Sequence, residues 1–98
     1  MKHTINLSTQ QITDLGVIWN DLVTRGDKAF SEASNHAVAA AEHRNRAKAE
    51  DNVEISIVWM NQAAGREAKV DKLNAEGDRL MEQAALVHSI ISQIKNNG

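Results

Sequence analysis

The segment WMNQAAGREAKVDKLNAEGDRLMEQAALVHSIISQI, residues 59–94, decides the fold, because mostly apolar or small residues recur along it at alternating steps of three and four. The segment ITDLGVIWNDLVTRGDKAFSEASNHAVAAAEHRNRA, residues 12–47, has the same spacing. Such steps place one residue per turn on one side of an α-helix, and that line of residues, called the seam below, needs a partner along its length. The first seam is Ile12, Leu15, Trp19, Leu22, Gly26, Ala29, Ala33, His36, Ala40, His43 and Ala47; the second is Trp59, Ala63, Arg66, Val70, Leu73, Gly77, Leu80, Ala84, Val87, Ile91 and Ile94.

The strongest break between the two seams is Glu50-Asp51-Asn52. The sequence therefore predicts an all-α fold, a long antiparallel helical hairpin with coiled-coil spacing. We expect one helix over about residues 9–50, a turn at 50–52, a second helix over 53–95, and a single domain over 1–98. Each arm would be about 60 Å long, which leaves only one seam per helix to bury.

The start of the first helix carries a clear signal. Ser8 can cap the helix, and Gln11, three residues later, can complete a capping box. Leu7 and Ile12 occupy the two positions of a hydrophobic staple. Asp51 followed by Glu54 gives the second helix a weaker version of the same signal.

A small α+β fold is the alternative, with short strands near 3–7 and 53–59. Val53 to Ile57 alternates apolar and polar residues, as a strand does. A sheet of only two strands is marginally stable, which favours the all-helical prediction.

Two glycines are predicted to lie opposite each other in the paired helices. A turn near residues 51–52 places Gly26 opposite Gly77, although a glycine within a helix costs about 1 kcal/mol relative to alanine. We expect the helices to approach closely there, with Phe30 or Met81 filling the space. On one flank the same pairing brings Arg25 near Glu76 and Glu32 near Lys69.

The apolar stripe is wider than the seam. Val23, Phe30, Met60 and Met81 widen it on one flank, and Ile18 and Ile90 widen the other flank near the open end. A wide stripe is typical of helices in a four-helix bundle. We expect these six residues to form an interface, either in a homodimer or with a partner helix.

An enzyme is not expected. The chain has no cysteine, no Gly-rich phosphate loop and no His-Glu-x-x-His motif. No glutamate stands three residues before a histidine, as a carboxylate di-iron bundle would require. We therefore expect no catalytic residue, metal or cofactor, and interpret His36 and His43 as a polar layer near the turn.

The expected function is that of a non-enzymatic helical protein-interaction module: a small adaptor, inhibitor or chaperone-like protein with a protein partner. The alternative is a small RNA- or DNA-binding regulator that uses Arg44, Arg46 and Lys48 near the turn. The net charge of −2 makes nucleic acid the less favoured partner.

The predicted location is the cytoplasm, without a membrane partner. No apolar run approaches the length of a membrane span. Residues 1–6 begin with a charge but have no apolar run behind it, so no signal peptide is expected.

Overall fold

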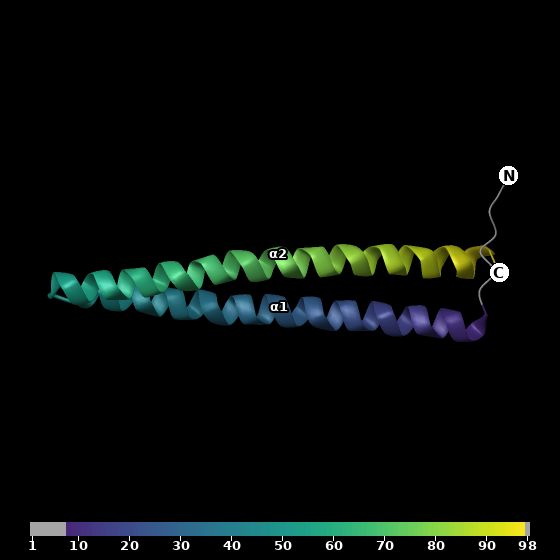
Figure 1. Ribbon diagram of the computed structural model, residues 1–98, viewed down its shortest axis with the longest axis horizontal. Helices are drawn as coiled ribbons and strands as arrows, with labels where there is room; N and C mark the ends of the chain where they lie inside the picture. The colour runs from purple at the N-terminus through teal and green to yellow at the C-terminus, as the bar shows by residue number, and fades with distance from the viewer. Residues whose placement is uncertain (1–7, 98) are drawn as a thin grey trace.

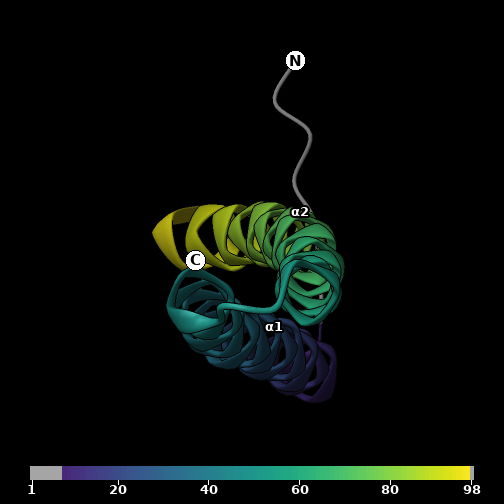
Figure 2. The ribbon, with the colours of Figure 1, turned by 90° about the vertical axis from the view of Figure 1, so that its left-hand side faces the viewer.

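The computed structural model is a hairpin of two antiparallel helices, which confirms the predicted all-α fold (Figure 1). It describes residues 8–97. Helix α1 spans Thr9–Ala49 and helix α2 spans Val53–Asn97, close to the predicted ranges. The molecule measures 71 × 24 × 14 Å. Seen from the turn, the two helices cross at an angle and diverge towards their open ends (Figure 2).

Hydrogen bonds at the helix ends explain where α1 and α2 begin. The capping box at Ser8 is confirmed: the Gln11 N–H donates to Ser8 Oγ at 3.2 Å, and the Ser8 N–H donates to Gln11 Oε1 at 2.9 Å. Leu7, the first half of the expected staple, lies outside the described residues. The cap of α2 is Asn52 rather than Asp51, because Asn52 Oδ1 accepts the N–H of Glu54 at 3.0 Å.

The predicted alternative strand over 53–59 is wrong, because this segment forms the first two turns of α2. Asn52 Oδ1 also accepts the Ile55 N–H at 3.2 Å, and Asn52 O accepts the Ser56 N–H at 2.9 Å. The Ser56 hydroxyl donates to Ala47 O at 2.8 Å, which ties this turn of α2 to the end of α1. The cap at Asn52 and the hydrogen bond between Ser56 and Ala47 stabilise the helix more than the short apolar–polar alternation of Val53 to Ile57 favours a strand. The other suggested strand, 3–7, lies outside the described residues.

The core follows the predicted seams but is thin. Its buried residues are Gly26, Ala29, Ala33, Ala40, Ala47, Ala63, Gly77, Leu80 and Ala84. Among the described residues, no large side chain is fully buried. Alanine lets two helices approach closely, but it removes little apolar surface from water, so the hairpin gains little stabilisation from its own interior.

The two seam glycines lie under large side chains of the opposite helix, as predicted. A methyl group at Gly77 would come within 2.6 Å of Phe30 Cε1. A methyl group at Gly26 would come within 2.8 Å of Met81 Cε. Each glycine therefore makes a notch that a side chain of the other helix fills.

Candidate interaction surface

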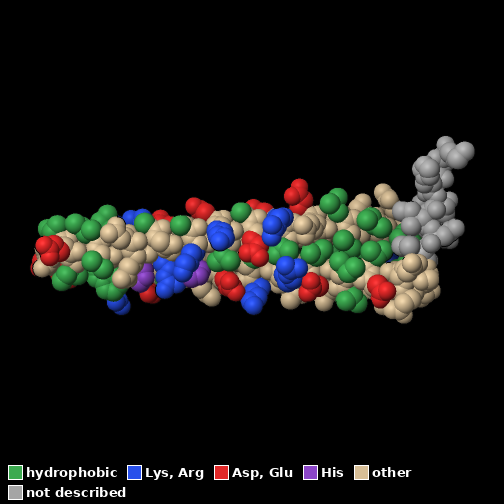
Figure 3. All heavy atoms as spheres, in the orientation of Figure 1, with side chains coloured by type: hydrophobic (Ala, Val, Ile, Leu, Met, Phe, Trp, Pro, Cys, Tyr) green, Lys and Arg blue, Asp and Glu red, His purple; other side chains and the backbone are tan. Residues whose placement is uncertain are grey.

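Large apolar side chains remain exposed at both ends of the rod. Their exposed fractions range from 39% for Ile90 to 71% for Val53. The group near the turn is Val53, Ile55, Ile57, Val58 and Met60; the group near the open end is Val17, Ile18, Leu86 and Ile90. Figure 3 shows apolar side chains near the turn and towards the open end of one face, with charged side chains between them. Exposed apolar surface of this extent is typical of an interaction site.

The six predicted interface residues fall into two groups. Ile18 and Met60 are each 48% exposed, and Ile90 is also exposed. Val23, Phe30 and Met81 are half-buried. Because Phe30 and Met81 already cover the seam glycines, they present only part of their surface to a partner.

Of the exposed apolar residues near the turn, sequence reasoning predicted only Met60 as an interface residue and missed Val53, Ile55, Ile57 and Val58. Of the segment Val53–Met60, only Ser56 and Trp59 are not exposed. Its remaining apolar side chains point outward on several sides of α2. The signal was present in the sequence, since a helix that is apolar on all sides usually lies inside an assembly.

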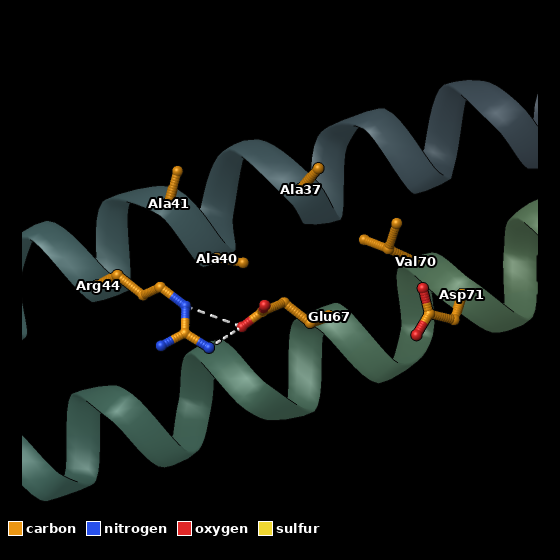
Figure 4. Close-up of a pocket in the computed structure, with 7 residues that line it drawn as sticks. All are labelled: Ala37, Ala40, Ala41, Arg44, Glu67, Val70 and Asp71. Carbon is orange, nitrogen blue, oxygen red and sulfur yellow. Dashed lines mark hydrogen bonds and ion pairs between the residues drawn. The ribbon is translucent and has the colours of Figure 1, made fainter.

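A hollow of about 400 Å³ opens between the helices (Figure 4). It is lined by Ala37, Ala40, Ala41, Arg44, Glu67, Val70 and Asp71. The small alanine side chains leave space between the two helices. At one edge Arg44 Nε donates to Glu67 Oε1 at 2.9 Å, and the two side chains form an ion pair across the helices. The hollow has room for an apolar side chain of another molecule next to the Arg44–Glu67 ion pair.

The structure brings two of the three predicted basic residues together. Arg44 and Lys48 line one hollow of about 210 Å³ with Met60, and Arg44 is also paired with Glu67. The Arg46 guanidinium lies 4.9 Å from the centroid of the Trp59 ring.

The expected ion pairs Arg25–Glu76 and Glu32–Lys69 do not form within residues 8–97. Arg25 instead lies 3.7 Å from Asp21 of its own helix. Arg25, Glu32 and Glu76 do line one hollow, so the prediction placed them on the correct flank.

The predicted polar layer is present near the turn. Arg66 Nη1 lies 2.8 Å from His36 Nδ1. The His43 ring lies 5.2 Å from the Trp59 ring, and His43 Nδ1 is buried without a hydrogen-bond partner. In the part of the chain that the structure describes, no three His, Asp or Glu side chains are grouped as a metal would require.

Over residues 8–97, neither helix contains a stretch of the length and hydropathy needed to cross a membrane. The sequence matches no protein-family model, no curated protein and no solved structure.

Proposed function

We propose that the protein is a non-enzymatic helical interaction module, which forms a homodimer with the architecture of a four-helix bundle and binds a protein partner. One observation carries this proposal: the hairpin buries almost only alanine and glycine, while ten of its larger apolar side chains are exposed. Its accessible surface is 7274 Å², against about 5,500 Å² for a compact monomer of 10.8 kDa. Covering the exposed apolar side chains supplies the stabilisation that the thin core lacks.

The dimensions of the rod support association along its length. Its radius of gyration is 21.4 Å, against about 13 Å for a compact domain of this length. One face measures 71 by 24 Å, roughly 1,700 Å², and a stable interface needs about 800 Å² from each partner. A second hairpin can therefore bury enough area on one face and leave other surfaces for a partner.

A nucleic-acid regulator that uses the predicted basic residues has less support. Arg44 and Lys48 line one hollow, but Glu67 neutralises Arg44, and Arg46 lies over the Trp59 ring instead. Apolar side chains dominate the exposed ends, and burial of apolar surface is the main driving force of protein association.

Sedimentation equilibrium of matched variants tests the proposal. We expect the wild-type protein to be a dimer at tens of micromolar. Ile18→Glu and Met60→Glu place a charge at equally exposed positions of the two ends, and both should shift the protein towards monomer without loss of helical circular dichroism. Val38→Glu is the control, because Val38 is 59% exposed but lies in neither apolar group. A wild-type monomer at this concentration would refute the dimer.

A further inference from the structure

Basic side chains of both helices gather on one flank near the turn. They surround a hollow of about 230 Å³ lined by His43, Gln62, Gly65, Arg66 and Lys69. In the half of the rod nearer the turn, Figure 3 shows two histidine side chains on either side of Lys or Arg side chains. Gly65 leaves the surface open here, because a methyl group at this position would have no neighbour within 4 Å.

Arg66 has no ion-pair partner among residues 8–97. It is half-buried on the seam, and its Nη1 lies 2.8 Å from His36 Nδ1. A guanidinium can only donate hydrogen bonds, so His36 Nδ1 is the acceptor in this contact. Within residues 8–97, neither Arg66 nor Lys69 makes an ion pair. A partly buried cation without a counter-ion is unfavourable, and an anion in the hollow would compensate it.

Arg46 is a third cation in the part of α1 near the turn. Its guanidinium lies over the Trp59 ring, whose other neighbour is His43. Arg46 also makes no ion pair in the described part of the chain. The aromatic contact does not neutralise its charge, and Arg46 does not itself line the hollow.

In other hollows of the rod a carboxylate lines the surface or pairs with a lining cation. The hollow of Arg44 and Lys48 has no carboxylate in its lining, but Glu67 pairs with Arg44. A hollow of similar size, about 240 Å³, is lined by Arg25, Lys28, Glu32 and Glu76, two cations and two carboxylates, together with Ala29 and Leu73. In the hollow of Figure 4, Glu67 neutralises Arg44. Only cationic and neutral side chains line the hollow at Arg66 and Lys69.

We propose that this hollow binds an oxyanion of the phosphate type, with Arg66 and Lys69 as its charged contacts. Arg66 has further N–H donors beside the one directed to His36, and a planar guanidinium suits two oxygens of one phosphate group. Lys69 supplies a second charge on the same helix. The phosphate group can belong to a free phosphate compound or to the phosphodiester backbone of a nucleic acid. None of the residues that line the hollow belongs to either exposed apolar group.

Fluorescence of Trp59 provides the test, because this ring contacts both His43 and Arg46. In a Trp19→Phe background, Trp59 is the only tryptophan. Sodium phosphate is titrated against the full chain at pH 7, with sodium chloride withdrawn to hold the ionic strength constant. We expect a saturable change in emission. Lys69→Met should weaken binding by about tenfold, the loss of one charge-assisted contact.

Lys28→Met is the matched control. It removes the same charge from the hollow of similar size that also contains carboxylates, so phosphate binding should be unchanged. Arg66→Met should abolish the emission change. If circular dichroism shows that this variant does not fold, Lys69→Met carries the test, because Lys69 is exposed.

A short single-stranded oligonucleotide is titrated in parallel to identify the source of the phosphate. Saturation by both ligands, weakened in Lys69→Met, indicates a phosphodiester; saturation by sodium phosphate alone indicates a free phosphate compound. The proposal is wrong if sodium phosphate gives no saturable change, or if Lys28→Met weakens binding as much as Lys69→Met does.

Discussion

Replacing each helical glycine by alanine measures how the two helices fit together. Alanine in place of a helical glycine gains about 1 kcal/mol from helix propensity wherever space allows. Gly16 and Gly65 have such space, since a methyl group at either would have no neighbour within 4 Å. Gly77→Ala is different because the new methyl group would lie 2.6, 2.8 and 2.9 Å from Cε1, Cζ and Cδ1 of Phe30.

The distances give the size of the effect. Three atoms of one rigid ring lie too close to the new methyl group, so the Phe30 ring must leave its position over Gly77. Overpacking of this kind costs about 1–3 kcal/mol, which cancels or exceeds the propensity gain of about 1 kcal/mol. At Gly26 the nearest atom is the mobile end of Met81, at 2.8 Å, with Sδ and Cγ at 3.3 Å. Gly26→Ala should therefore fall between Gly65→Ala and Gly77→Ala.

Thermal unfolding followed by circular dichroism, at one fixed protein concentration, gives the comparison. Gly65→Ala should raise the melting temperature by about 4–8 °C, and Gly77→Ala should leave it unchanged or lower it. In a Phe30→Leu background, Gly77→Ala should recover its stabilising effect because the ring is gone. Equal increases for Gly65→Ala and Gly77→Ala in the wild-type background would refute the packing of Phe30 on Gly77.

Three further predictions concern the cap, the core and the ion pair. Asn52→Ala should cost about 1 kcal/mol and speed amide exchange in the first turn of α2, because Asn52 Oδ1 accepts two backbone N–H groups there. Leu80→Ala should cost about 2–5 kcal/mol in denaturant unfolding, because Leu80 is 2% exposed, whereas Val38→Ala should stay within about 0.5 kcal/mol. A double-mutant cycle on Arg44 and Glu67 should give a coupling of at most about 1 kcal/mol that falls with added salt, because their side chains are 44% and 47% exposed.

The sequence by itself determined which side of each helix is buried. The seam residues recur once per turn, and burying that side is the one way a long amphipathic helix can cover its apolar residues. Local hydrogen bonding likewise fixed the start of α1, because Ser8 and Gln11 lie three residues apart in any helix. The cover over Gly26 and Gly77 was also predictable, since Phe30 and Met81 lie within one turn of the facing level.

Only the tertiary structure decided which side chains meet across the helices. A turn near residues 51–52 places the seam residue Ala84 opposite Trp19. The Trp19 ring instead lies 6.0 Å from the ring of His88, which is one helical turn beyond Ala84. Arg44 pairs with Glu67, while Arg25 turns to Asp21. The periodicity of apolar residues determines which side of a helix faces the other helix. Which side chain a residue contacts there also depends on the axial offset and crossing angle of the two helices and on the side-chain rotamers. Because a helix repeats every 3.6 residues, a small offset exchanges one partner for another. Arg66 makes no ion pair in the described part of the chain, and this too depends on side-chain contacts that the spacing of residues does not contain.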